Sequence, residues 1–447
     1  MGGLIEADYV VIGAGAMGLA FTDEILTRTD ASVAILDRRA RPGGHWNDAY
    51  PFVRLHQPSH FYGVNSQKLG TDAIDRTGWN AGLAELASGT EVCAYYDQLM
   101  NRRFLPSGRV AFHPSTSWDG ERAVSTPSGR VFEVHARRAI VDAAYMKVSV
   151  PSTHPPRYAV EDGVRVVPPN ALPKEDRPAD GYTIIGAGKT AFDAILWLLA
   201  NHVDPAEITW IVPRDSWLIN RAVAQPGDGF RVGEQVGLLA EAASAHDALL
   251  RLEAAGQLLR IDPRVEPSMY RCATVSEPEL EQLRRIEQVV RMGRVARVTQ
   301  SGLELDGGVL EQGPNVLYVD CTADGLERRP VVPVFAERRI TLQTVRGCQQ
   351  VFSAALLGMI ETLAAPVDEK NALAGVIPHP DATRDYFSNT LEHMKNMVQW
   401  SQHPEIGPWL AASRLSPGGG PDSEGPDPAK ALRAAANLQQ FLEDWKD

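Results

Sequence analysis

Two β-α-β patterns, far apart in the chain, dominate the distribution of apolar and polar positions. At residues 8–37, the apolar run "DYVVIG" predicts a buried strand, residues 16–28 predict a helix, and "SVAILD" predicts a second buried strand. The same order begins again at Tyr182, with a strand, a helix to about residue 201 and the apolar run "EITWIVPR". Strands that alternate with helices favour parallel sheets, so we predict an α/β fold with two such units.

The rest of the chain shows mixed patterns. Strands joined by turns are expected within 108–145 as a small antiparallel insertion, and a proline-rich connector follows to about residue 180. Residues 232–293 are predicted to be largely helical, strands are expected to return between 295 and 321, and residues 347–363 are expected to form a buried helix. A tether, "SPGGGPDSEGPDP", and a short helix complete the pattern.

Composition excludes several classes of protein. Of the 447 residues, 44% are apolar and 22% charged, which is ordinary for a globular protein, and the net charge is −12. Nucleic-acid and anionic-membrane partners need a basic surface, so we expect neither. No apolar run approaches the ~20 residues of a transmembrane helix, and the start lacks the pattern of a signal peptide. We therefore expect a cytoplasmic protein; the oligomeric state is not readable from the sequence.

The sulfur and imidazole groups show no metal or disulfide pattern. The four cysteines, Cys93, Cys272, Cys321 and Cys348, are far apart and form no Cys-x-x-Cys pair. We expect reduced thiols. The 11 histidines form no pair with metal-ligand spacing, so no metal site is predicted.

The first glycine-rich turn fits the dinucleotide-binding motif G-x-G-x-x-G. Gly13, Gly15 and Gly18 stand between the first strand and its helix, which is the context that the motif requires. The glycines permit a tight turn and a close approach of a pyrophosphate to the helix N-terminus. Asp37 ends the next strand, where a carboxylate can accept hydrogen bonds from ribose hydroxyls. We predict a Rossmann-like domain that binds a dinucleotide here.

The segment after this unit, "RRARPGGHWNDAYPFVRLHQPSHFYG", resembles the FAD-binding half of group B flavin monooxygenases. That group comprises flavin-containing, Baeyer–Villiger and N-hydroxylating monooxygenases. Its pattern of an acid, Gly-Gly-x-Trp, Tyr-Pro and an arginine is matched here by Asp37, Gly43-Gly44-His45-Trp46, Tyr50-Pro51 and Arg54. The resemblance implies that residues 38–63 lie along FAD, with Arg38, Gly44, His45 and Trp46 in contact with it.

The second glycine-rich turn, in "GYTIIGAGKTAFDAILWLLA", looks at first like the end of an ATP-binding P-loop. A P-loop needs a glycine five residues before the Gly-Lys-Thr, and that position is Thr183. The spacing instead gives the dinucleotide form Gly186-x-Gly188-x-x-Ala191, with Lys189 and Thr190 inside the loop. We predict a second dinucleotide site.

The residue that ends the following strand indicates which dinucleotide binds. Arg214 stands there in place of an acid, and an arginine can form a bidentate contact with the 2′-phosphate of NADP. Lys189 and Arg221 are further candidate cations. Asp215 leaves NAD as an alternative, because its carboxylate could accept from a ribose hydroxyl. NADPH is the preferred prediction.

Two dinucleotide loops in one chain resemble the flavoproteins with two dinucleotide-binding domains, and residues 140–151 and 315–326 are similar to their crossover segments. The resemblance implies an FAD-binding domain at 1–155 that is completed at 315–415, an NADP-binding domain at 156–314 with a helical insertion at 222–293, and a tether with a C-terminal helix at 416–447. Disulfide reductases share this plan, but they need a redox cysteine pair near FAD, so we exclude them.

The implied activity is that of an FAD-dependent, NADPH-using monooxygenase that oxidises a small organic molecule with O₂ through a flavin C4a-(hydro)peroxide. Arg54 and His56 are the candidate catalytic residues, and Gln57, Ser59 and His60 are further polar groups expected near the ring; an imidazole near its titration point could protonate or stabilise a peroxide. The Baeyer–Villiger signature before the second loop is missing, and His56 replaces the acid of those relatives. Two alternatives remain open: an FAD-dependent dehydrogenase or oxidase whose second domain is structural, and a non-catalytic FAD/NADP-binding sensor.

Overall fold

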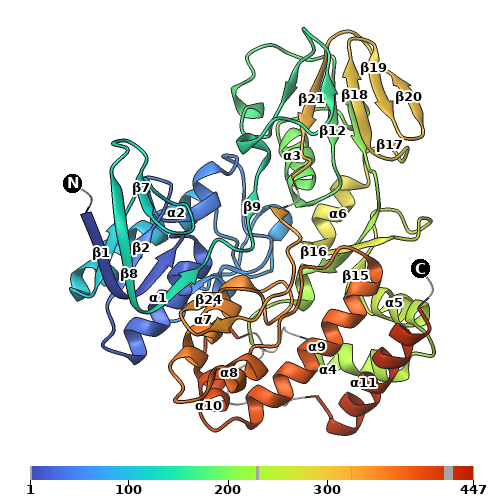
Figure 1. The fold of residues 1–447 in the computed structure, drawn as a ribbon. Coiled ribbons are helices and arrows are strands. Elements are labelled where there is room, and N and C mark those ends of the chain that lie inside the picture. Colours follow the sequence, from blue (N-terminus) through green and yellow to red (C-terminus); the bar gives the residue numbers. More distant parts are fainter. Residues whose placement is uncertain (1–2, 228–230, 324, 417–425, 446–447) are drawn as a thin grey trace.

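The first lobe is built on a mostly parallel sheet in the order β23-β24-β8-β1-β2-β5, visible at the left of Figure 1. The computed structural model describes residues 3–227, 231–323, 325–416 and 426–445. The strands of this sheet are β1 (Gly3–Ile12), β2 (Val33–Leu36), β5 (Val110–His113), β8 (Val131–Asp142), β23 (Phe335–Ala336) and β24 (Arg339–Thr341). β1 pairs in parallel with both β2 and β8. The predicted β-α-β unit at 8–37 is confirmed, with α1 at Ala16–Arg28.

Helices cover one face of this sheet, and a small hairpin covers the other. α1 packs against α7 (Gln350–Glu361), whose apolar residues are all buried, as expected for the helix at 347–363. The opposite face buries Ile5, Val10 and Ala34 beneath β6 (Thr116–Trp118) and β7 (Ala123–Ser125). Only β6, β7 and the start of β8 form the antiparallel insertion that the pattern predicted. β5 and β8 join the main sheet in parallel, so that prediction was too broad.

The second lobe, at the top of Figure 1, contains two stacked sheets, with α-helices packed on the outer face of one of them. A five-stranded parallel sheet has the order β11-β21-β12-β13-β17, and a four-stranded sheet has the order β10-β18-β19-β20. Alternate residues of a strand face opposite sides, so Ile184 of β12 packs with α3 and α6 while Ile185 packs with the smaller sheet. The elements are β10 (Ala159–Val160), β11 (Val166–Val167), β12 (Gly181–Ile185), α3 (Lys189–Ala200), β13 (Ile208–Ile211), α6 (Glu277–Leu283), β17 (Gln288–Val290), β18 (Val295–Thr299), β19 (Gly302–Leu305), β20 (Gly308–Glu311) and β21 (Val316–Asp320).

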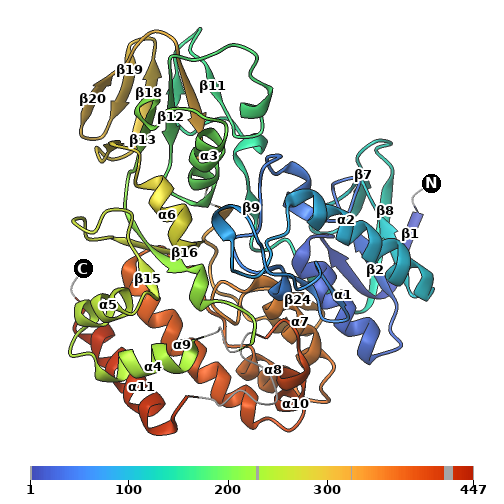
Figure 2. The same cartoon turned by 180° about the vertical axis from the view of Figure 1, so that it is seen from behind.

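A third body of helices lies below the second lobe, as Figures 1 and 2 show from opposite sides. Its core joins a three-stranded sheet to four helices. The members are β14 (Ser216–Asn220), β15 (Leu258–Leu259), β16 (Met269–Val275), α4 (Val232–Glu241), α5 (Ala245–Ala254), α9 (Thr383–Gln402) and α11 (Pro428–Glu443). The described residues of the segment 222–293 therefore contain strands β15, β16 and β17 beside three short α-helices, and the prediction of a largely helical stretch was wrong in this respect. The helix expected at the C-terminus packs on α4 and α9 and buries Leu438 and Phe441.

Shorter elements connect these bodies. They are β3 (Gly63–Val64), β4 (Gln67–Lys68), α2 (Gly89–Leu99), β9 (Val148–Ser149), β22 (Gly325–Leu326), α8 (Val367–Leu373) and α10 (Ile406–Ala412). β21 pairs with β12, so the chain returns to the first lobe only after Asp320. The division into domains at 155 and 315 stays a prediction, and most of the tether at 416–428 lies outside the described residues. None of the described helices combines the length and apolarity needed to cross a membrane.

Candidate functional site

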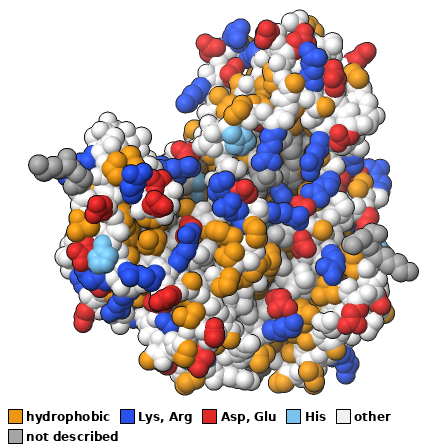
Figure 3. Space-filling model, in the orientation of Figure 1, with side chains coloured by type: hydrophobic (Ala, Val, Ile, Leu, Met, Phe, Trp, Pro, Cys, Tyr) orange, Lys and Arg blue, Asp and Glu red, His pale blue; other side chains and the backbone are white. Residues whose placement is uncertain are grey.

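One cavity of about 1800 Å³ lies where the three bodies meet. The carboxyl ends of β1 and β12, with both glycine loops, open into it, which is where open parallel sheets bind their ligands. Figure 3 shows Lys and Arg side chains gathered around the hollow between the second lobe and the rest of the molecule. The sequence-predicted residues that line the cavity are Gly13, Gly15, Asp37, Arg38, Gly44, His45, Trp46, Arg54, His56, Gly186, Gly188, Lys189, Thr190 and Arg214.

The first glycine loop makes the tight turn that its motif predicts. Gly13 has a φ of 108°, a conformation that side chains disfavour. Gly18 does not line the cavity, because it faces β1; a Cβ there would overlap the carbonyl oxygen of Gly13. Asp37 is buried, and its two carboxylate oxygens accept the backbone N–H groups of Ala14 and Arg39, each at 2.7 Å. The loop and the strand-ending acid are thus held against each other.

The second glycine loop leaves an open space in front of its backbone. Gly186 has a φ of 127°, and its carbonyl accepts the indole N–H of Trp210 at 2.8 Å. A Cβ at Gly188 would meet no atom within 4 Å. Ala191 is fully buried, and its small side chain lets the helix pack closely on the strand. The space at Gly188 and the free N-terminus of α3 fit a pyrophosphate.

Lys189 belongs to a polar bridge between the lobes. It forms an ion pair with Asp193, one turn further along α3. Asp193 also accepts the hydroxyl hydrogen of Tyr50 at 2.7 Å, and Tyr50 comes from the first lobe. Burial raises the pKa of Asp193, while Lys189 opposes that rise. Lys189 therefore has an acidic partner in the protein, which the glycine-loop pattern could not indicate.

The three charged residues near the end of β13 have different surroundings. Arg214 lines the cavity and holds Asp381 through contacts of 2.9 and 3.1 Å. Asp215 is buried and forms a two-contact pair with Arg291, at 2.8 and 3.0 Å. Arg221 is fully buried and pairs with Glu279 at 2.8 Å, so the expectation that it adds charge to a nucleotide site was wrong.

His56 is a hydrogen-bond donor toward the cavity and not a titrating acid. Its Nδ1 accepts the backbone N–H of Thr274 at 3.3 Å. Burial, helped by the charges of Lys189 and Arg221, lowers the pKa of His56 to about 3. The neutral ring therefore carries its hydrogen on Nε2. Burial likewise lowers the pKa of His45 to about 4, so the expectation of an imidazole near its titration point was wrong for both.

Of the other polar groups expected near the flavin ring, some line the cavity and others only hold loops together. Gln57 lines the cavity. Arg54 also lines it, but it is exposed and its guanidinium donates to the carbonyl of Leu86 at 3.3 Å. Ser59 is buried and bridges Glu85 and Ala87, and His60 pairs with Asp72 at 3.0 Å. Ser59 and His60 therefore hold loops together and do not face the cavity.

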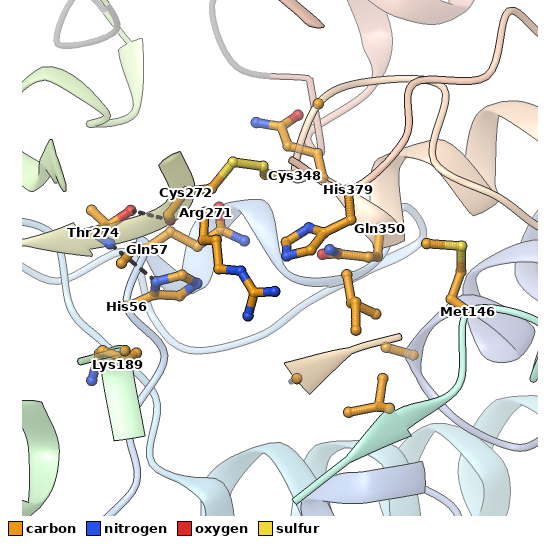
Figure 4. Close-up of a pocket in the computed structure, with 18 of the residues that line it drawn as sticks. His56, Gln57, Met146, Lys189, Arg271, Cys272, Thr274, Cys348, Gln350 and His379 are labelled. Carbon is orange, nitrogen blue, oxygen red and sulfur yellow. Dashed lines mark hydrogen bonds between the residues drawn. A yellow bond between two sulfur atoms is a disulfide. The ribbon is translucent and has the colours of Figure 1, made fainter. Parts of the chain in front are cut away.

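Several cavity residues carried no sequence signal. Figure 4 shows Arg271 of β16 facing His379 and Gln350, which come from the segment after the second lobe, while Thr274 of the same strand lies beside His56. Cys272 and Cys348 form a disulfide with a Cα–Cα distance of 6.3 Å, so the prediction of four reduced thiols was wrong. The exclusion of disulfide reductases rested on the lack of a cysteine pair, and the pair at the cavity removes that ground. The two residues are 76 positions apart in sequence, and no spacing rule links them.

The lining of the cavity is strongly basic although the whole chain is acidic. Nine arginines and two lysines line it, and Asp37 is the one acidic residue among the described residues that do so. The chain as a whole has a net charge of −12. Concentrated positive charge in a concave site attracts phosphate groups. In the described part of the chain, no group of three His, Cys, Asp or Glu residues could hold a metal ion.

Comparison with known proteins places the chain in a family. A model of the NAD(P)-binding Rossmann-like domain matches residues 11–66, over the first glycine loop. The uncharacterized protein Rv2000 of Mycobacterium tuberculosis is 50% identical over 418 residues, which cover 92% of this chain and 78% of that protein. The uncharacterized protein Mb2023 of Mycobacterium bovis matches to the same extent. The chain belongs to the family of these mycobacterial proteins.

Solved structures show the fold of this family. The closed crystal structure of cyclohexanone monooxygenase is similar with a TM-score of 0.50 and 15% identity, over 98% of each chain. A flavin-containing monooxygenase from Stenotrophomonas maltophilia covers 83% of this chain and 99% of its own, with a TM-score of 0.42 and 17% identity. The predicted fold class, α/β with two Rossmann-like domains, is confirmed, and the fold is similar to that of cyclohexanone monooxygenase.

Proposed function

We propose that the protein is an FAD-dependent, NADPH-using monooxygenase that acts on a small organic molecule. The observation that carries this proposal is that both glycine loops open into one basic cavity. Two dinucleotides bound at these loops would share the cavity, and its eleven cationic side chains would offset their phosphates. A dehydrogenase or oxidase, or a sensor, could use the same two loops, so experiment has to distinguish these alternatives from a monooxygenase.

Contacts between the first loop and the segment 38–63 support FAD at this end of the cavity. The backbone N–H of Gly43 donates to the carbonyl of Ala14 at 2.8 Å. Gly44 lies so close to the first loop that a Cβ on Gly44 would be only 2.9 Å from the Cα of Gly15. The segment therefore begins at the proposed pyrophosphate site and continues into the cavity through His45, Trp46 and His56. One extended ligand can contact both parts.

The surroundings of β13 support NADPH at the second loop. Asp215 already accepts two hydrogen bonds from Arg291, so it is not placed to accept from a ribose hydroxyl in the cavity. Arg214 does line the cavity, and Arg214, Arg271 and Arg328 all surround the single carboxylate of Asp381. Arg328 also lies 3.7 Å from Asp385, so three guanidinium groups face two carboxylates and positive charge remains for a 2′-phosphate.

Bound FAD would accept hydride from NADPH and activate O₂, and the residues of this chain would position the ligands and exclude water. His56 would donate a hydrogen bond from Nε2 toward the reacting centre. Apolar side chains of α4 and α9, including Val236, Met394 and Met397, form the wall farther from the loops and suit an organic substrate. The type of oxygenation stays open, since His56 stands where the Baeyer–Villiger relatives have an acid.

The test begins with the purified full chain. It should be yellow or become yellow with added FAD, and NADPH should bleach the flavin without oxygen. Addition of oxygen should then give a transient spectrum distinct from oxidised and reduced flavin, and a panel of ketones, amines and sulfides should yield an oxygenated product. A colourless protein that cannot be reconstituted would overturn the proposal. Bleaching without any oxygenated product would favour the dehydrogenase, and flavin that NADPH does not bleach would favour the sensor.

A further inference from the structure

We propose that Cys272 and Cys348 form a reversible dithiol–disulfide site in the cavity wall, which small thiols reduce and small disulfides restore. In its oxidised form this site ties the strand β16 to the start of α7. In its reduced form the two parts of the wall are held only by noncovalent contacts.

The disulfide joins parts of the fold that are otherwise separate. Cys272 lies in β16, and Cys348 lies two residues before α7, which belongs to the core of the first lobe. Their Cα–Cα distance of 6.3 Å is within the usual range for a disulfide. Figure 4 shows the sulfur bridge spanning the top of the cavity between the two chain segments. The bridge is therefore a tether across the cavity.

The bridge is open to a reagent in the cavity. Both cysteines line it, and Cys348 is half-buried while Cys272 is 6% exposed. Cys348 Sγ is thus the sulfur that an incoming thiolate reaches. The remaining two cysteines are poor competitors for exchange, because burial raises the pKa values of Cys93 and Cys321 and keeps them as thiols.

The backbone at both ends of the bridge has an uncommon conformation. Cys272 has a φ of 56° and Cys348 a φ of 58°. Side chains other than glycine rarely adopt positive φ, and such residues persist where the surrounding structure holds them. Within the described residues only four other non-glycine positions have a positive φ, so both half-cystines belong to a small set. The fold holds the two sulfurs face to face.

The tether is directly connected to groups of the proposed active site. Thr274, two residues after Cys272, donates its backbone N–H to His56 at 3.3 Å, and Thr274 Oγ1 donates to the carbonyl of Cys272 at 3.3 Å. On the other side, Gln349 and Gln350 follow Cys348 and line the cavity. Release of the tether therefore acts on both walls of the cavity.

The chemistry is ordinary thiol–disulfide exchange. A thiolate RS⁻ attacks Cys348 Sγ, the bond to Cys272 breaks, and Cys272 leaves as a thiolate that takes a proton from water. A second thiolate attacks the R-bearing sulfur of the mixed disulfide and releases RSSR and the Cys348 thiolate. Two thiols are oxidised, and one cystine is reduced to two cysteines. Disulfides in reducing compartments are usually transient and catalytic or redox-sensing, which this exchange would explain.

Peptide mapping of the full chain tests the bridge itself. Trypsin cleaves after Arg271, Arg284, Arg346 and Lys370, so Cys272 and Cys348 fall in peptides 272–284 and 347–370. In protein purified in air and digested without reductant, the two peptides should appear joined, and dithiothreitol should separate them. Peptides found separate, with both thiols free, would overturn the proposal. This experiment needs no flavin, so its outcome is independent of the proposed function.

The effect of the tether is measured by thermal unfolding. Dithiothreitol should lower the midpoint of the wild type by several degrees, oxidised glutathione should restore it, and the double variant Cys272→Ser/Cys348→Ser should respond to neither. Cys93→Ser is the matched control and should respond like the wild type. Equal responses of the wild type and the double variant would overturn the proposal. The rate at which NADPH reduces the flavin should also differ between the protein with the disulfide and the protein with two thiols. This last measurement rests on the proposed function.

Discussion

His56 owes its proposed role to where its ring lies. The neighbouring strand β16 supplies a backbone N–H to Nδ1, and burial with two nearby cations keeps the ring neutral by lowering its pKa to about 3. A neutral donor at Nε2 can hold an oxygen atom in the cavity at any physiological pH. It cannot serve as an acid that loses its proton near neutrality.

The first prediction concerns the pH dependence of turnover. His56→Leu should lower kcat/KM by about tenfold, the effect of one lost hydrogen bond. The shape of the pH profile should be the same as in the wild type between pH 5.5 and 8, because the folded-state pKa lies below this window. His56→Gln, which keeps an N–H donor, should retain most of the activity. A transition near pH 6.5 that disappears in His56→Leu would show instead that this histidine titrates.

The second prediction concerns the choice between NADPH and NADH. Arg214→Ala should raise the KM for NADPH by about tenfold or more and leave that for NADH almost unchanged, because only the former has a 2′-phosphate. Arg328→Ala is the matched control, since Arg328 also pairs with Asp381 but is 60% exposed and does not line the large cavity. An equal loss with both nucleotides, or the same loss in both variants, would remove the 2′-phosphate role.

At the scale of the elements, the two glycine loops show which structural features can be predicted from neighbouring residues. Positive φ at Gly13 and Gly186, and the contact of Gly18 with the first strand, follow from a turn of fixed spacing between a strand and a helix. The tight turns depend on neighbours within a few residues, and the sequence alone therefore predicted them. The contact of Gly18 with the first strand was found only in the structure. Strand β15 within 222–293 was missed because it has only two residues, and the seven-residue β16 was missed because its pairing with β14 is nonlocal.

The third prediction separates the ligand-binding role of a glycine from its packing role. Gly188→Ala should leave the thermal midpoint unchanged, because the new Cβ meets no protein atom, but should weaken NADPH binding at least tenfold by filling the space for the pyrophosphate. Gly18→Ala should lower the midpoint, because its Cβ would overlap Gly13. Exposed Gly313→Ala is the control and should do neither. Unchanged NADPH affinity in Gly188→Ala would contradict the assignment of the second loop.

At the scale of the whole molecule, the candidate site combines residues that no local pattern connects. The loops, Asp37 and the segment 38–63 could be placed from the sequence because each lies beside its motif. The bridge from Tyr50 to Asp193, the arginines around Asp381 and the Cys272–Cys348 pair could not, since their partners are 53 to 167 residues apart. Their contacts exist only after the three bodies have packed together.

The pairing of α1 with α7 also sets an order of events during biosynthesis. Helix α1 ends at Arg28, and the helix that covers it begins only at Gln350. At roughly 5–20 residues per second, the ribosome needs about 16–64 s to make the chain between them. The sheets of the second lobe, whose last strand ends at Asp320, can form in this interval. The apolar face of α1 that contacts α7 remains exposed until α7 has been made. The nascent chain therefore exposes the apolar surface of an incompletely folded first lobe for most of its synthesis. We expect chaperones that bind such surfaces to act on it.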